Sequence, residues 1–386
     1  MESISFHFRT RAPRLTLLFN PHDLGPVQAL DRPVTGRTLR QLQVEAAKAE
    51  GFGKPLTAAL MQALARVLPD ATRVFAAIEN WPGDLASDGV IFRLNAGLHA
   101  LALDGCEPGV LRASYEDGAM PCSAALDAAL AETLDVHAGA LLGWLSHPTQ
   151  TNEVARVAGL VAALIEVGRG DGLPCEVLEL GASAGLNLNA AHYAVRLGGL
   201  AACAPASAVT LAPEWRGTPL APGPLRIASA RGVDLHPLDV TCADDRRSLA
   251  AYVWPGETAR AERLAAAINI AAAHPPAVDS GLASAWLLQR FAEPQPPGVR
   301  RVVFHSMVLQ YADAAERTAI DYAFALAGAR AEPDRPLARV SIEWRADRGA
   351  VELRIAQWDG AAHRGESRIA AHCHPYGEWI DWRGLA

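Results

Sequence analysis

The sequence of 386 residues lacks several features that would assign it to a specialised class of protein. Its six cysteines are scattered and no two form a Cys-x-x-Cys pair, so we expect reduced thiols in a cytoplasmic protein. The longest apolar run near the N-terminus is Leu15 to Phe19, which is too short for the core of a signal peptide. No run approaches the length of a membrane span, and we expect no membrane partner.

Positive charge is also scarce. The net charge is -7 and the pI is near 6.0, which argues against a large nucleic-acid interface because phosphate binding requires clustered Lys and Arg. Hydrophobic residues make up 50% of the chain and charged residues 20%, a composition typical of a globular protein with a core. We therefore expect a small-molecule substrate that is neutral or cationic. The oligomeric state is not indicated by the sequence.

Three regions differ in pattern. Residues 1–36 mix Arg, Pro and Gly without a regular period and are interpreted as an irregular N-terminal arm. Residues 37–145 carry apolar residues at helical spacing, which predicts a helical cap domain. In residues 146–386, strand-like runs alternate with helical ones and end in two strands around Asp347-Arg348-Gly349. This pattern predicts an α/β fold with a Rossmann-like, doubly wound, mostly parallel sheet that ends in an antiparallel hairpin.

The centre of the third region is the stretch from Cys175 to His192. A short apolar run is followed by small residues with glycines at Gly181 and Gly185, and then by a helical pattern predicted to reach about Val195. Glycine allows the backbone to pass close to a ligand, and free N–H groups at a helix start favour a phosphate, a carboxylate or the edge of a nucleotide. The loop has neither the Walker ending nor the Gly-x-Gly-x-x-Gly spacing, which disfavours an NTPase and an ordinary dehydrogenase.

Polar residues at the other predicted strand ends are candidates for the same site, because ligands of parallel sheets bind at the carboxyl ends of the strands. Asp234 ends the second predicted strand, where a carboxylate suits ribose hydroxyls. Asp279 follows the third strand and has two interpretations, a contact to adenine or a turn before Gly281. His305 ends the fourth strand and is either a general base or a buried core histidine.

A polar segment precedes the central strand. Gln150, Thr151, Asn152, Glu153 and Arg156 open a predicted helix, and Thr151 or Asn152 is the expected cap. Glu153 and Arg156 lie three residues apart, so they form either a surface ion pair or a polar group over the glycine loop.

Near the end of the chain, His372-Cys373-His374 suggests a metal ligand set. Adjacent strand residues point to opposite faces, however, so the cysteine does not share a face with the histidines, and we predict no metal site.

The form Glu179-x-Gly181-x-x-x-Gly185 resembles the first motif of class I S-adenosylmethionine-dependent methyltransferases. Over residues 37 to 382 the chain also resembles a bacterial family of uncharacterised proteins whose second half is methyltransferase-like. That resemblance depends on three segments in particular: Thr149 to Arg156, Leu178 to Leu188 and Gly232 to Val240. It continues through Val253-Trp254-Pro255, the segment around His305 and the ending His374-Pro375-Tyr376-Gly377.

The resemblance implies S-adenosylmethionine as cofactor and methyl transfer to a small molecule as the reaction. The helical cap is expected to close over the site, and His305 and Glu153 are the candidate catalytic residues. The alternative is a non-catalytic protein that binds a nucleoside or S-adenosylmethionine on the same fold; a hydrolase or lyase that uses the same cleft is a further possibility. The expected cofactor-binding residues are Glu179, Gly181, Ala182, Ser183, Gly185, Asn187, Asp234, Asp279, Thr151, Asn152 and Arg156.

Overall fold

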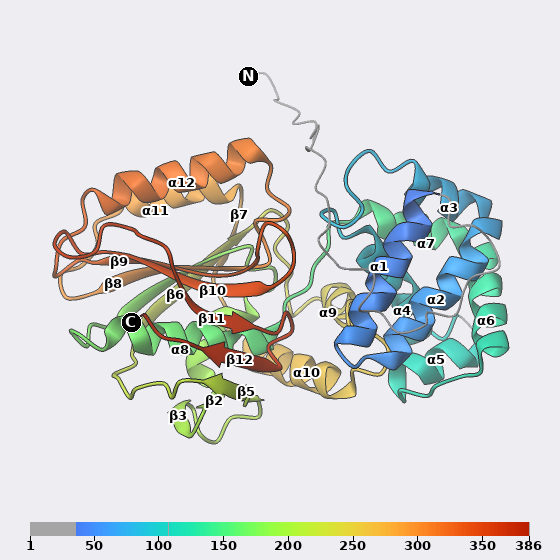
Figure 1. Cartoon of the computed structure of the whole chain (residues 1–386), viewed down its shortest axis with the longest axis horizontal. Coiled ribbons are helices and arrows are strands. Elements are labelled where there is room, and N and C mark those ends of the chain that lie inside the picture. Colours follow the sequence, from blue (N-terminus) through green and yellow to red (C-terminus); the bar gives the residue numbers. More distant parts are fainter. Residues whose placement is uncertain (1–35, 107, 386) are drawn as a thin grey trace. The chain divides into compact units, whose positions relative to one another are not determined.

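The computed structural model describes residues 36–106 and 108–385, so the arm expected over residues 1–36 lies outside this part of the chain except for its last residue. The described residues form two compact units, which are coloured by sequence in Figure 1. The first contains residues 36–151 and Ala243–Glu262, and the second contains Asn152–Cys242 and residues 263–385. No helix of the described ranges is long and apolar enough to cross a membrane.

The first unit is helical, as the spacing of apolar residues predicted. Pro55 begins one of its helices, a position that suits the fixed φ of proline. The helices are α1 (Arg37–Gly51), α2 (Pro55–Val67), η1 (Leu68–Asp70), α3 (Thr72–Glu79), α4 (Val90–Leu103), α5 (Gly109–Glu116), α6 (Ser123–Val136), α7 (Ala138–Ser146), α9 (Ala243–Ala251) and the start of α10 (Thr258–Ala273).

Helix α4 joins the two sequence segments of the first unit. Ala96 and Ala100 of α4 form a buried apolar cluster with Ala251 and Tyr252, which come from the end of α9 and the residue after it. The Nδ1 atom of His99 lies 3.0 Å from the carbonyl oxygen of Val253. Burial lowers the pKa of His99 to about 4, so its imidazole is neutral at physiological pH. The helical unit is therefore completed by a segment that lies about ninety residues further along the chain.

The second unit is built on a nine-stranded sheet. Its spatial order is β5-β12-β11-β10-β9-β8-β1-β6-β7, and the five strands from β9 to β7 are parallel. These strands are β1 (Cys175–Leu180), β6 (Ile227–Asp234), β7 (Val278–Ser280), β8 (Arg300–Ser306) and β9 (Leu337–Trp344). The antiparallel continuation is β10 (Val351–Trp358), β11 (Arg368–Cys373) and β12 (Trp379–Trp382), with β5 (Glu214–Gly217) at the edge.

The expected α/β fold with a hairpin is confirmed, since β9 and β10 pair antiparallel around residues 345–350. Helices cover both faces of the sheet in Figure 1. On one face, α11 (Ala283–Ala292) and α12 (Ala314–Gly328) bury an apolar cluster against side chains such as Leu178 and Leu180 of β1. On the other face lies α8 (Val157–Gly168), where a Cβ on Gly159 would meet Ile342 and Leu353 of β9 and β10.

Two sequence expectations for this unit were wrong. The segment after the glycine loop is a short 3-10 helix, η3 (Leu186–His192), with non-helical angles at Asn189, and a strand follows where a helix to about Val195 was expected. The abundance of Gly, Pro and Ala in residues 198–224 predicts an insertion with little regular structure, yet these residues carry strands. A small sheet forms from β2 (Ala194–Leu197), β3 (Leu200–Cys203) and β4 (Thr210–Leu211). Hydrophobic periodicity does not reveal these strands, because each has four residues or fewer.

Candidate functional site

The glycine loop follows β1 at the carboxyl edge of the parallel strands. Gly181 and Gly185 have φ angles of 69° and 70°, and Ser183 also has a positive φ of 53°. A Cβ on Gly181 would overlap the side chain of Val308, so the glycine is required by packing within the chain itself. Ala182 is buried and occupies the space that a side chain on Gly232 would need.

The N–H groups of this loop bind acceptors within the chain. Gly181 N and Ala182 N both donate to the carbonyl oxygen of Val233 on β6, at 2.9 and 3.0 Å. Gly185 N donates to Ala182 O at 2.7 Å, and Leu186 N donates to Oδ1 of Asn152 at 3.1 Å. The sequence predicts a helix start with free donors at this position. In the structure, the loop N–H groups instead bind acceptors of β6, of the segment before α8 and of the loop itself.

Four polar side chains lie buried beside this loop, and we call them the Glu179 cluster: Asn152, Arg156, Glu179 and Asn187. Nδ2 of Asn187 donates to Oε1 of Glu179 at 2.8 Å, and Asn152 binds the loop through Leu186 N. Only 2% of Glu179 and 3% of Asn187 is exposed. Within the described part of the chain, Oε2 of Glu179 and Oδ1 of Asn187 are buried and have no hydrogen-bond partner. The cluster therefore holds two buried oxygen atoms without a hydrogen-bond partner among the described residues.

Burial has a large effect on Glu179. It raises the pKa of this carboxyl to about 8, partly opposed by the hydrogen bond from Asn187. The nearby charge of Asp234 raises the pKa further, and the guanidinium of Arg156 lowers it. Glu179 is thus mainly protonated near neutral pH in the folded chain.

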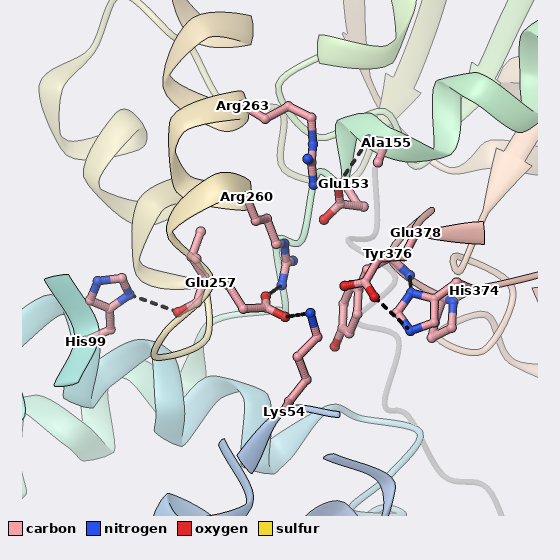
Figure 2. A network of polar contacts seen from close by, with 12 residues as sticks. Lys54, His99, Glu153, Ala155, Glu257, Arg260, Arg263, His374, Tyr376 and Glu378 are labelled. Carbon is pink, nitrogen blue, oxygen red and sulfur yellow. Dashed lines mark hydrogen bonds and ion pairs between the residues drawn. The ribbon is translucent and has the colours of Figure 1, made fainter. Parts of the chain in front are cut away.

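The segment that precedes α8 has a different local structure from the one expected. Glu153, and neither Thr151 nor Asn152, caps the 3-10 turn η2 (Val154–Arg156), accepting a hydrogen bond from Ala155 N at 3.0 Å. Glu153 also pairs with Arg263 of α10 at 3.4 Å, as Figure 2 shows. Since Glu153 is 3% exposed, the interpretation as a surface ion pair was wrong. Thr151 ends the first unit, and its buried hydroxyl has no hydrogen-bond partner among the described residues.

Arg156 binds the C-terminal part of the sheet. Its Nε donates to the carbonyl oxygen of Pro375 at 2.9 Å, and the side chain is 7% exposed. The backbone of Gly377 lies so close to Ala155 that a Cβ there would be 2.7 Å from the Ala155 Cβ. The two polar motifs at Asn152 to Arg156 and His374 to Gly377, more than two hundred residues apart, therefore pack together.

Asp234 ends β6 and connects to the same loop. Its Oδ2 accepts from Ser183 N at 2.8 Å, and its Oδ1 accepts from His236 N at 2.9 Å. The residue remains partly exposed. A carboxylate has about four acceptor positions, so each oxygen of Asp234 keeps the capacity for another hydrogen bond.

His305 does not join this cluster. Leu180 pairs with His305 in the sheet register and Glu179 pairs with Phe304, so the side chains of Glu179 and His305 point to opposite faces. Nδ1 of His305 lies 2.7 Å from Oε1 of Glu343, and Nε2 accepts from Nε of Arg339 at 3.1 Å. Burial lowers the pKa of His305, although Glu343 opposes this shift. With both ring nitrogens engaged, the geometry argues against a general-base role.

Asp279 is likewise separated from the Glu179 cluster. It lies within β7, opposite Val233 in the register, and so faces α11. Its carboxylate forms an ion pair with Arg231 at 2.6 Å and accepts from Nε1 of Trp286 at 2.6 Å. The hydrogen bonds from Arg231 lower its pKa. These partners support neither the adenine contact nor a simple turn, and they place Asp279 in the packing of α11 against the sheet.

Sequence patterns did not single out the residues that shape the loop after β8. Oε1 of Glu343 accepts from Val308 N at 3.2 Å and Leu309 N at 3.4 Å, besides its contact with His305. Met307 has a positive φ of 56°, which is rare for a residue other than glycine. Glu343 belongs to an alternating strand, and a polar residue at such a position usually indicates a solvated face. A carboxylate that organises a loop has no distinct signal in sequence.

Within the described ranges, His372, Cys373 and His374 do not gather further metal ligands. Nδ1 of His374 accepts from Tyr376 N at 3.3 Å, and Nε2 lies 3.8 Å from Glu378, as Figure 2 shows. Across residues 36–106 and 108–385, no group of three or more His, Cys, Asp or Glu side chains has an arrangement suited to a metal ion.

Comparison with known proteins places the whole pattern in one family. No curated protein and no solved structure gives a significant match to the chain. A family model described as "uncharacterized protein conserved in bacteria (DUF2332)" matches residues 40–382, which include most of both units and all the motifs discussed above. The match confirms the resemblance to an uncharacterised bacterial family. The chain therefore belongs to this bacterial family.

Proposed function

We propose that the chain binds S-adenosylmethionine at the glycine loop and transfers its methyl group to a small molecule. Taken in chain order, the five parallel strands lie in the spatial order third, second, first, fourth, fifth, which is the order of doubly wound nucleotide-binding folds. We interpret this as a Rossmann-like sheet. In such sheets the ligand binds at the carboxyl edge where the strand order reverses, and β1 with its glycine loop occupies that place.

Asp234 is the observation that carries the proposal. It stands at the end of the strand next to β1, bound to the loop through Ser183 N, with acceptor capacity left on both oxygens. That arrangement suits the two hydroxyls of a ribose. Because the loop donors bind Val233, Asp234 and Asn152, little remains to bind a phosphate. A nucleoside ligand without phosphate therefore fits better than a nucleotide.

The residues present also fit the amino-acid end of the cofactor. Oδ1 of Asn187 is a buried acceptor, and Oε2 of Glu179 becomes one when the carboxyl releases its proton, a change that the positive charge and three donors of a bound ammonium group favour. Arg156 provides positive charge near Glu179. When bound, S-adenosylmethionine supplies an electrophilic methyl group. The protein's contribution is then to hold the acceptor in line with that group and to exclude water, which requires no protein base when the acceptor is already a nucleophile.

A second candidate function is binding without catalysis. It is favoured by the contacts of His305 and Glu153, the two residues predicted to act as catalytic bases. His305 faces the other side of the sheet with both nitrogens engaged, and Glu153 caps η2 and pairs with Arg263. A chain of this kind would act as a nucleoside-responsive sensor or partner protein. Binding of the cofactor with no turnover against any methyl acceptor would favour this function.

Calorimetric titration of the full chain with S-adenosylmethionine and S-adenosylhomocysteine tests the proposal. We expect one-to-one binding, and absence of binding for both compounds would refute it. Asp234→Asn retains the shape but loses the charge and one acceptor, so affinity should fall about tenfold, or about 1.4 kcal/mol.

The matched control is Asp279→Asn, the same change at the neighbouring strand. Its carboxylate is held by Arg231 and Trp286, so affinity should stay within about twofold of the wild type, far less than the tenfold step of 1.4 kcal/mol. Equal losses in both variants would contradict the ribose assignment. A cofactor analogue without ribose hydroxyls separates ribose binding from loop bracing, because Asp234→Asn should weaken its binding much less than that of the cofactor.

A further inference from the structure

The second unit has a pocket beside η3, the 3-10 helix that follows the glycine loop. Its volume is about 360 Å³, within the range of small-molecule sites. Residues from the last turns of α10, the end of η3 and the connection between β3 and β4 line it. His274 precedes β7 by four residues, and Pro276 between them packs against Gly185. Its polar lining residues are His192, Ser207, Asn269 and His274.

Two imidazole rings stack at this pocket. The ring centroids of His192 and His274 are 3.9 Å apart, and the ring planes differ by 14°. Nδ2 of Asn189 donates to the carbonyl oxygen of His274 at 3.1 Å. This hydrogen bond holds the backbone of His274 against η3, the short helix that carries His192. Parallel rings cannot share one metal ion, because an imidazole ligand holds the metal in its own plane.

The segments that form the pocket contain no carboxylate. Residues 186–192, 200–211 and 263–274 have no Asp, Glu or Lys. Their titratable groups, apart from the two histidines, are Arg263, which pairs with Glu153, and Cys203, whose pKa burial raises to about 11. Burial and the charge of His274 lower the pKa of His192. Protonation of the pair therefore creates two positive charges with no counter-ion in these segments.

We propose that the pocket between His192 and His274 binds a doubly charged oxyanion, such as the phosphate group of a small metabolite, with proton uptake by the stacked pair. Two imidazolium charges match a dianion, and the carboxamide of Asn269 supplies further donors. The hydroxyl of Ser207 accepts from Val209 N at 3.1 Å and keeps its own proton to donate. His274 directly follows the C-terminus of α10, an end that favours a positive charge.

This inference does not depend on the proposed function, because it uses neither the glycine loop nor the Glu179 cluster. Binding of the anion and of protons must be reciprocal, since each stabilises the state that the other prefers. A dianion should thus bind more tightly at acidic pH and raise the pKa of His192.

Sulfate is the appropriate probe, because its two charges do not change between weakly acidic and weakly basic solution. We would titrate the isotope-labelled full chain with sodium sulfate at about pH 5.8 and about pH 8 and follow the histidine ring signals by NMR. Sodium chloride keeps the ionic strength equal. We expect binding to be at least about tenfold tighter at the lower pH, with an upward shift of the His192 pKa.

His274→Gln and His192→Gln should each remove most of the pH dependence. His363→Gln is the matched control, because His363 is an exposed histidine on the connection between β10 and β11 of the same unit. His274 is also exposed, so its replacement should leave the fold intact, which circular dichroism verifies. Equal sulfate affinity at both pH values would overturn the proposal, and so would a His274→Gln variant that binds sulfate as the wild type does.

Discussion

Two buried oxygen atoms, Oε2 of Glu179 and Oδ1 of Asn187, set the chemistry of the candidate site. Both lack a hydrogen-bond partner among the described residues, although buried polar atoms in proteins nearly always have one. An unsatisfied buried group costs about 1–3 kcal/mol, so a ligand with matching donors recovers free energy when it binds. Glu179 lessens its own cost by remaining protonated, which is why its pKa is raised to about 8.

The raised pKa of Glu179 predicts how stability depends on pH. The folded chain holds a proton on Glu179 up to about pH 8, while the unfolded chain releases it near the ordinary value of 4.5. The contribution of Glu179 to the free energy of unfolding is therefore complete below pH 4.5. It is lost as pH rises towards 8, by at most about 1.4 kcal/mol per pH unit. Glu179→Gln keeps an acceptor for Asn187 and cannot ionise.

We expect the stability of Glu179→Gln, relative to wild type, to increase between about pH 5 and about pH 8 in urea denaturation. The control is Glu366→Gln, since Glu366 is exposed in the same unit. A constant difference between Glu179→Gln and wild type over this range would show that Glu179 is ionised in the folded state.

At the scale of elements, the strand ends and the loops that follow them are connected by hydrogen bonds and side-chain packing. The glycine loop receives its support from β6 through Val233 and Asp234, and from the loop after β8 through Val308. Glu343 of β9 in turn holds the loop after β8. The carboxyl edge of the sheet is therefore one connected structure, and a change in one loop should affect the neighbouring loops.

Gly181→Ala tests this connection. Its Cβ would overlap Val308 and lie in a left-handed conformation with φ of 69°. The matched control is Gly298→Ala, where φ is 73° and no atom lies within 4 Å of the added Cβ. The control should cost only the strain, about 1–2 kcal/mol, whereas Gly181→Ala should cost about 1–3 kcal/mol more.

Thermal and urea denaturation measure the loss of stability in both variants. Because the additional cost comes from one contact, the double variant Gly181→Ala with Val308→Ala should recover part of it, beyond the sum of the two single changes. Strict additivity of the two substitutions would contradict the packing explanation.

At the scale of the whole molecule, the chain leaves the first unit after Thr151 and returns to it at Ala243. Tyr252 and Ala251 complete the apolar cluster of α4, and Val253 accepts the hydrogen bond of His99. The helices before residue 152 therefore lack part of their core without the later segment. The long helix α10 begins in the first unit and continues into the second.

A fragment of residues 36–151 should consequently fold poorly. We expect it to bind a hydrophobic dye and to melt without a cooperative transition, because the apolar face of α4 stays exposed. Joining residues 243–262 to this fragment through a Gly/Ser linker should restore cooperative melting. The matched control joins the same residues 243–262 through a linker of equal length, but with the substitutions Tyr252→Ser and Ala251→Ser. Equal behaviour of the two joined fragments would contradict the assigned role of this segment.

Much of the fold follows from local pattern. The helical character of residues 37–145, the alternation of strands and helices, the glycine loop and the β9–β10 hairpin were predicted, because helical and strand periods and glycine turns are properties of neighbouring residues. The candidate site was predicted in part. The structure brings Asn152, Arg156, Glu179 and Asn187 together, with Asp234 beside them.

What the sequence determined by itself is therefore the type of each element and the place of the glycine loop. Only the tertiary structure decided which side chains share a face. A shift of one residue in register reverses the face, so the pairing of Leu180 with His305 separates that histidine from Glu179. Register, the contact of Arg156 with Pro375 and the return of Ala243–Glu262 to the first unit all depend on long-range packing, which no local period encodes.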